Sequence, residues 1–245
     1  MTQEMPYPKP LRLAGGIDVK QLRRDFLKDG HVRIEPFLHP DDANILRLAL
    51  LARKDWRLVL NSGDKVFELD ADMLRNMGRD HRAALDKAVL ESSRYEFQYR
   101  YCSIRVPDFF EDTLCTGDVL MQFVAFLRSE SVLKLVRTTI GMQQIAFADG
   151  QATRYDVGHF LTAHDDAVEG KHRHAAYVMG LTDNWRAEWG GLLLFHEGRD
   201  QLAGRRPAFN SLDLFKVPSV HSVSFVNPSA ASSRLSVTGW FRSYS

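Results

Sequence analysis

Hydrophobic and polar positions change their period partway along the chain. Up to about residue 142, apolar residues recur at helical spacing, as Leu22, Phe26 and Leu27 do between Asp18 and Gly30. The pattern predicts helices over about 18–28, 40–51, 71–92 and 120–139. Alternating runs at 31–34 and 94–106 predict strands, and 109–117 is expected to be a loop.

From about Gln143 the pattern becomes short strands separated by turn residues. The predicted strands are 145–147, 152–155, 175–179, 191–195, 211–215, 222–225 and 235–238. Short strands at this spacing are typical of an antiparallel sandwich or barrel. A sheet must bury one face, so the preceding helices should pack on it. We predict an α+β fold with a mainly β core in one domain, 1–245, with a mainly helical layer at 1–142 and the β core at 143–245.

The most informative polar residues are a His-x-Asp triplet, a distant histidine and an arginine. His164 and Asp166 form the triplet, His221 opens a later strand-like run and Arg234 begins the last one. Side chains alternate along a strand, so residues two apart would share a face, and Asp165 would point away as the lesser candidate. Two imidazoles and one carboxylate form the facial triad of non-heme Fe(II) oxygenases. The order predicts that His164, Asp166 and His221 bind metal.

The other histidines fit this chemistry less well. His172 and His174 lie in a charged turn, and His159 has no carboxylate at the matching offset. A zinc hydrolase would need three ligands and a general base. The chain has no His-Glu-x-x-His or paired-cysteine motif to support one.

Alternate residues on the last predicted strand could bind an anionic co-substrate. Arg234, Ser236, Thr238 and Trp240 share one face if the strand is regular. A guanidinium holds a carboxylate through two parallel hydrogen bonds, and the two hydroxyls would add donors. Trp240 would wall the site against water. Tyr155 could donate its phenol to the same carboxylate or could be an ordinary core tyrosine.

Taken together, these motifs resemble a known enzyme family. The segments that carry the resemblance are 153–166, Trp189-Gly-Gly-Leu-Leu-Leu-Phe195, 209–215, His221 and Arg234-Leu-Ser-Val-Thr-Gly-Trp-Phe241. They resemble the prolyl-hydroxylase branch of the Fe(II)/2-oxoglutarate oxygenases, in particular the ribosomal-protein prolyl hydroxylases and their bacterial relatives. The resemblance covers roughly residues 143–245, with a looser similarity in the helices before them.

The resemblance implies a double-stranded β-helix, or jelly-roll. It implies that Fe(II) binds His164, Asp166 and His221, that Arg234 pairs with the far carboxylate of 2-oxoglutarate, and that Tyr155, Leu193 and Thr238 wall the pocket. One departure is Gly180, which stands about where some relatives carry a pocket tyrosine.

The implied activity is that of a 2-oxoglutarate-dependent dioxygenase resembling prolyl 4-hydroxylases. It would use O2 to hydroxylate a C–H bond of a prolyl residue in a protein or peptide, releasing succinate and CO2, with ascorbate as an additional reductant. The alternative substrate is a free amino acid or small metabolite. Two other classes stay open: a non-catalytic β-helix sensor for metal or ligand, and a cupin-like dioxygenase that has no use for Arg234.

The substrate rim is harder to assign. Segments 56–65, 109–117, 170–173 and 199–207 could contribute to a rim, although each also reads as an ordinary solvated loop. The solvated loop is the preferred interpretation for all four.

Composition narrows the remaining choices. The formal net charge of +1, with acids and bases interspersed, gives no reason to expect nucleic acid or an anionic membrane surface as a partner. The two cysteines, Cys102 and Cys115, argue against a disulfide scaffold. Residues 1–16 lack a signal-peptide core, and no apolar run is long enough to span a bilayer. We therefore expect a soluble, cytoplasmic protein.

Overall fold

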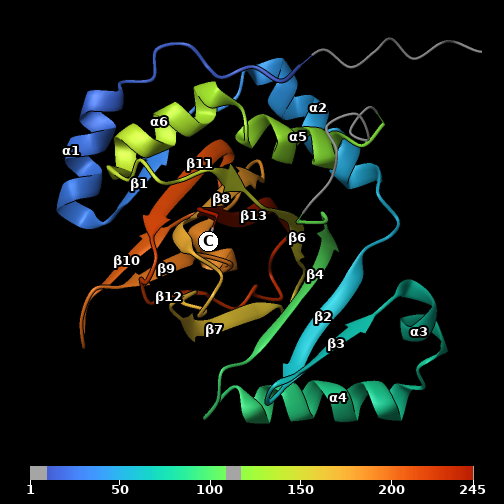
Figure 1. Cartoon of the computed structure of the whole chain (residues 1–245). Helices are drawn as coiled ribbons and strands as arrows, with labels where there is room; N and C mark the ends of the chain where they lie inside the picture. Colours follow the sequence, from blue (N-terminus) through green and yellow to red (C-terminus); the bar gives the residue numbers. More distant parts are fainter. Residues whose placement is uncertain (1–9, 109–116, 245) are drawn as a thin grey trace, which may run out of the picture.

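The computed structural model describes residues 10–108 and 117–244 (Figure 1). The helices are α1 (Val19–Asp29), α2 (Pro40–Ala52), α3 (Ala71–Asn76), α4 (Arg79–Ser92), α5 (Val119–Leu127) and α6 (Glu130–Ile140). The strands are β1 (His31–Ile34), β2 (Arg57–Ser62), β3 (Lys65–Leu69), β4 (Tyr99–Arg105), β5 (Phe147–Ala148), β6 (Gln151–Tyr155), β7 (Phe160–His164), β8 (Arg173–Leu181), β9 (Leu193–His196), β10 (Leu202–Arg205), β11 (Phe209–Lys216), β12 (His221–Val223) and β13 (Arg234–Arg242).

The strands form one curled antiparallel sheet with the order β1-β11-β8-β13-β6-β4-β7-β12-β9-β10. The β2–β3 hairpin joins through β2 to β4, and β5 pairs with β13. The curled antiparallel sheet has the predicted jelly-roll arrangement, so the predicted fold class is confirmed. The curl places β6, β7, β12 and β13 around a common interior.

Helices cover one face of the sheet, as predicted. Figure 1 shows α1, α2, α5 and α6 on the side of β1, β11 and β8, with α3 and α4 beside the β2–β3 hairpin. The main core lies beneath the first group, where Val136 and Phe123 contribute to the same cluster as Met179 and Val237. Along β13, Leu235, Val237 and Phe241 are buried in that cluster. The alternate β13 residues are therefore directed into the curl of the sheet.

Two long helices predicted from apolar spacing are each divided. The segment 71–92 contains α3 and α4, because Met77 is extended and Gly78 begins a new helix. The segment 120–139 contains α5 and α6, because Ser129 has an extended conformation between them. Apolar spacing continues across both breaks, so periodicity alone did not reveal them. The first two predicted helices are present, with Asp18 accepting a hydrogen bond as the cap of α1.

Several strands were not predicted. Residues 56–65 and 199–207, interpreted as solvated loops, contain β2 and β10 respectively, and β3 was also missed. The extended segment expected around His164 is β7, which ends at His164. Of the segment 109–117, residues 109–116 lie outside the described residues. Across 10–108 and 117–244, no helix has the length and apolar character needed to cross a membrane.

Candidate active site

His164, Asp166 and His221 converge at one point inside the curled sheet. The Nε2 atom of His164 lies 3.3 Å from Oδ1 of Asp166, and Nε2 of His221 lies 3.4 Å from Oδ2. β7 and β12 are paired, with His221 directly opposite His164. One candidate ligand atom from each residue lies within 4.8 Å of the others, close enough for a single ion to contact all three.

Backbone carbonyls orient both imidazoles. His164 Nδ1 donates to the carbonyl oxygen of Thr162 at 3.0 Å, and His221 Nδ1 donates to that of Ser219 at 2.8 Å. A neutral imidazole that donates through Nδ1 carries its lone pair on Nε2. Both lone pairs are therefore available at the atoms nearest Asp166. Fixing a ligand's tautomer in this way is common around protein-bound metals.

Asp166 reaches the site by a different route from the one predicted. β7 ends at His164, and Asp166 has a positive φ of 64°, so the two do not share the face of a regular strand. The residue turns in a left-handed conformation, which Asp and Asn tolerate better than most residues. Asp165 is exposed and accepts a hydrogen bond from the Ala167 amide at 3.0 Å, and it lines the same cavity as the cluster.

Burial and charge favour the protonation states that bind a metal. Burial, together with the neighbouring His164, lowers the pKa of His221 to about 4. For Asp166, burial alone would raise the carboxyl pKa. Hydrogen bonding from His164 and the charges of both imidazoles outweigh that effect, so the pKa lies below its ordinary value. A neutral imidazole and an ionised carboxylate are the forms required of metal ligands.

The three residues open on a cavity of about 390 Å³. Predicted pocket residues that line it are Tyr155, Leu193, Arg234, Thr238 and Trp240. Ser236, on the same face of β13, is not among the lining residues, and its hydroxyl is paired with that of Thr153 at 2.8 Å.

Arg234 is a buried cation without an acidic partner. Its exposed fraction is 4%, and no carboxylate among the described residues forms an ion pair with it. Its guanidinium lies over the Tyr155 ring, 4.9 Å from the centroid. Burial lowers the arginine pKa, although the neighbouring Tyr155 opposes the shift. Burying a charge without a partner is costly, so this arrangement suits a site that receives an anion.

Aromatic residues on β4, and one that precedes the strand, also line the cavity. The sequence predicted only that they belong to a half-buried strand. Phe97, Tyr99, Tyr101 and Tyr155 form a series of ring contacts with centroid separations of 5.5, 5.6 and 5.3 Å. The half-exposed Phe97 ring lies 5.4 Å from that of His164. Aromatic residues alternate from position 97 to 101, and this pattern could have predicted that one face of the strand borders the site.

Gly180 is enclosed by backbone. A Cβ at this position would lie 2.3 Å from the carbonyl oxygen of Ala208. A tyrosine cannot be accommodated here in the present backbone, so co-substrate contacts on this side must come from other residues. The Trp189-Gly190-Gly191 turn precedes β9, which carries Leu193 to the cavity wall.

A second group of potential ligands lies elsewhere and is already paired. Cys102, Asp156 and His159 have donor atoms within 4.8 Å of one another. The Arg154 guanidinium contacts Asp156 at 3.1 Å and the Cys102 sulfur at 3.7 Å, which places a positive charge where a metal would bind. Burial raises the pKa of the Cys102 thiol to about 11, which disfavours the thiolate. We assign this group a structural role.

Comparison with known proteins agrees with the geometry of the first group. Residues 150–242 match the family model described as the 2OG-Fe(II) oxygenase superfamily. The matched region thus resembles the 2OG-Fe(II) oxygenase superfamily over about the last two fifths of the chain. The match contains all three clustered residues and Arg234. No curated protein matches the chain.

Several solved structures share the fold at low sequence identity. A Pseudomonas putida prolyl-4-hydroxylase has 15% identity and a TM-score of 0.57, with 93% of this chain and 100% of that chain covered. A Trichoplax adhaerens prolyl hydroxylase in complex with a hypoxia inducible factor oxygen degradation domain peptide fragment has 15% identity and a TM-score of 0.60, covering 92% and 89%. The non-heme alpha ketoglutarate dependent epimerase SnoN from nogalamycin biosynthesis has 13% identity and a TM-score of 0.54, covering 90% and 80%.

The matched family model implies the cofactors that were predicted: Fe(II), 2-oxoglutarate and O2. The residues present fit them. The cluster supplies two imidazoles and a carboxylate for iron, and Arg234 supplies a buried guanidinium without an acidic partner for a carboxylate.

Proposed function

We propose that this oxygenase hydroxylates a C–H bond of a prolyl residue in a peptide or protein. The observation that supports a 2-oxoglutarate-dependent reaction best is the buried, unpaired Arg234 on the wall of the same cavity as the His164–Asp166–His221 cluster. A cupin-like dioxygenase without this co-substrate would have no use for such an arginine.

In this proposal, His164, Asp166 and His221 hold the iron, and Arg234 pairs with the far carboxylate of 2-oxoglutarate. With O2 as the oxidant, bound iron and 2-oxoglutarate would supply the chemistry that converts C–H to C–OH: one oxygen atom of O2 would enter the product and the other the succinate that is released with CO2. Burial raises the pKa of the Tyr155 phenol, so it stays protonated and can donate a hydrogen bond to the same carboxylate.

The apolar part of the cavity wall would protect the reaction. Leu193, Phe215 and Trp240 line the cavity, and their side chains limit the water that can reach the iron. Excluding water strengthens the ionic contacts within a site and prevents side reactions. No described residue indicates whether ascorbate serves as a reductant, so its use stays a prediction.

A prolyl substrate is supported by the hydroxylases that share the fold, one of them in complex with a peptide. The half-exposed Phe97 at the cavity mouth offers a flat apolar surface suited to a pyrrolidine ring. A free amino acid or small metabolite is the second candidate. This second candidate is supported by the epimerase that has the same fold, because that enzyme belongs to small-molecule biosynthesis.

The deciding experiment is anaerobic titration of the Fe(II)-loaded protein with 2-oxoglutarate, followed through its visible metal-to-ligand charge-transfer band. We expect the band to appear, to weaken strongly in Arg234→Ala and to persist in Arg186→Ala, an exposed arginine outside the cavity lining. Iron binding without a band would contradict the proposal and favour the cupin-like alternative. A band without substrate-dependent succinate release would favour a sensor.

A further inference from the structure

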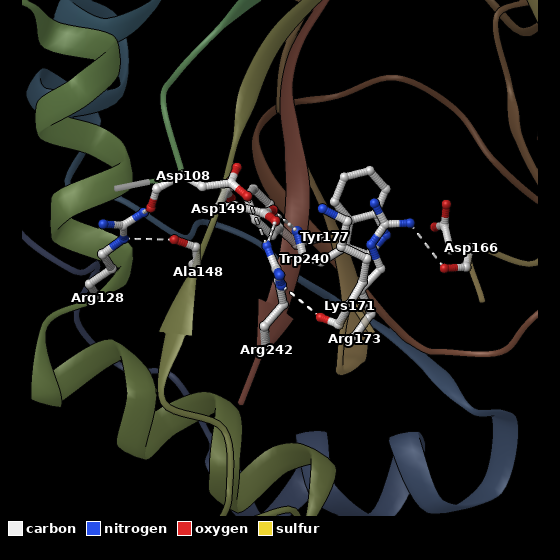
Figure 2. A network of polar contacts seen from close by, with 10 residues as sticks. All are labelled: Asp108, Arg128, Ala148, Asp149, Asp166, Lys171, Arg173, Tyr177, Trp240 and Arg242. Carbon is white, nitrogen blue, oxygen red and sulfur yellow. Dashed lines mark hydrogen bonds and ion pairs between the residues drawn. The ribbon is translucent and has the colours of Figure 1, made fainter. Parts of the chain in front are cut away.

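A second cavity adjoins the active-site cavity. It has a volume of about 380 Å³, and Tyr101, Gln151, Arg173 and Trp240 line both cavities. Figure 2 shows Arg173 and Trp240 between Asp166 on one side and the Asp149–Arg242 contacts on the other. The residues that separate the two cavities therefore include an arginine beside the proposed iron ligand.

Arg173 is held in place but has no acidic partner. Its guanidinium stacks on the Trp240 indole, 3.5 Å from the ring centroid, and NH1 donates to the Asp166 carbonyl oxygen at 3.1 Å. Its Nε atom is buried without a hydrogen-bond partner, and no ion pair to Arg173 occurs within 10–108 and 117–244. The side chain is thus oriented while part of its donor capacity is unused.

The nearby carboxylates Asp149 and Asp108 are already paired with another arginine. Arg242 contacts Asp149 at 3.0 Å and Asp108 at 3.2 Å, and Asp149 also accepts a hydrogen bond from the Trp240 amide at 2.8 Å. The Asp166 side chain faces the two imidazoles of the cluster. Because the nearby carboxylates already contact other residues, the unpaired arginine is suited to bind an anion from outside the chain.

We propose that Arg173 binds a carboxylate of the substrate next to the carbon that is oxidised. This inference rests on the proposed function. The carboxylate could be the α-carboxylate of a free or C-terminal amino acid, or the side chain of an acidic residue beside the target proline. Stacking on Trp240 prepares the guanidinium for planar, bidentate recognition.

The test compares probes that differ by one charge. N-acetyl-L-proline is paired with N-acetyl-L-prolinamide, and capped Pro-Asp and Asp-Pro dipeptides are paired with their asparagine counterparts. Each is titrated anaerobically into the Fe(II)–2-oxoglutarate protein, and its affinity is measured from the shift of the charge-transfer band. Because 2-oxoglutarate is saturating, the probes do not report on Arg234.

We expect at least one acidic probe to bind roughly tenfold to a hundredfold more tightly than its neutral counterpart, as a charge-assisted hydrogen bond would give. The preference should vanish in Arg173→Gln. It should persist in Arg105→Gln, whose native arginine lines the second cavity but is already paired with Glu68 at 3.0 Å. A preferred N-acetyl-L-proline would identify the α-carboxylate as the source, and a preferred dipeptide would identify an acidic residue.

The inference is overturned if the charge-transfer band forms but no probe pair shows a preference, including the case in which no probe binds. It is also overturned if Arg105→Gln loses the preference as fully as Arg173→Gln, because a general positive potential would then be responsible. If the role of Arg173 were only structural, Arg173→Gln would lower the affinities of the acidic and neutral probes equally. Absence of the charge-transfer band in the unmodified protein would instead count against the proposed function itself.

Discussion

Arg234 and Tyr155 are direct register partners on β13 and β6, and the guanidinium carbon lies 4.9 Å from the centroid of the phenol ring. The pairing places a cation and a hydrogen-bond donor side by side on one wall of the cavity. It also explains how residues far apart in the sequence can act on the same carboxylate. The two contributions of Tyr155, its ring and its hydroxyl, can be separated by substitution.

Tyr155→Phe keeps the ring over Arg234 and removes only the hydroxyl. We expect 2-oxoglutarate affinity to fall roughly tenfold to a hundredfold, because a hydrogen bond to a carboxylate contributes about 1.5–3 kcal/mol. Tyr155→Ala should weaken it further by removing the stacked ring as well. Titration of the charge-transfer band gives both affinities. Unchanged affinity in Tyr155→Phe would show that the phenol does not contact the co-substrate.

Substitutions at Asp166 should separate metal binding from backbone conformation. Asp166→Ala and Asp166→Gly both remove the carboxylate, so we expect each to lose Fe(II) binding and hydroxylation. Because φ at this position is 64°, alanine should also lower the free energy of unfolding by about 1 kcal/mol relative to glycine. Calorimetry of metal-free protein measures that difference. Wild-type turnover by either variant would exclude Asp166 as a ligand.

Asp42 should make stability depend on acid pH. Its carboxylate accepts hydrogen bonds from the Arg12 amide and guanidinium at 2.8–3.0 Å, and bonding to Arg12 lowers the pKa of Asp42. A depressed native pKa stabilises the fold above the unfolded-state value of 3.8, and this stability is lost as the pH falls through the native pKa.

Asp42→Asn should therefore be less stable than the native protein near pH 7, by about 1 kcal/mol given the partly exposed Arg12. The difference should shrink as the pH falls below 3.8 and should vanish below the lower native pKa, where the native carboxylate is protonated too. Urea denaturation at several pH values measures it. A difference that stayed constant down to pH 2 would mean that ionisation of Asp42 is not its source.

Gly180 should not accept a side chain. In Gly180→Ala the new methyl group would lie 2.3 Å from the Ala208 carbonyl oxygen, so the backbone must shift, at a cost of about 1–3 kcal/mol. Gly204→Ala on β10 is the matched control. Its Cβ would meet Leu194 at an ordinary 3.4 Å, so stability should change little. Equal melting temperatures for the two variants would contradict this account.

The active site was more accessible from the sequence than the details of the fold. The order of His164, Asp166, His221 and Arg234 is a property of the chain, and the cluster forms as expected. The reason given for the His-x-Asp spacing was wrong, because alternation along a strand does not extend to a residue with positive φ. Periodicity also could not place helix breaks at Ser129 or near Gly78, which depend on local backbone conformation.

Arg173 shows why some site residues escaped prediction. Charged neighbours in the segment 170–173 suggested a solvated loop. Its contact with Trp240 depends on the pairing of β8 with β13, in which Arg242 is opposite Arg173. Such a tertiary contact leaves no local sequence pattern. Phe97 and Tyr99 were easier to notice, because their alternation is visible in the sequence. The sequence did not show that their face of the strand borders the cavity.

β13 is hydrogen-bonded on both sides, to β6 and β8, and carries Arg234, Thr238 and Trp240 on a single face. Inserting or deleting one residue within it would turn that whole face toward the helices. Among proteins with this fold, insertions and deletions should therefore be absent from β13 and should accumulate in the connections around it. New substrate preferences would then arise from segments such as 165–173, while the strand proposed to bind 2-oxoglutarate stays unchanged in length.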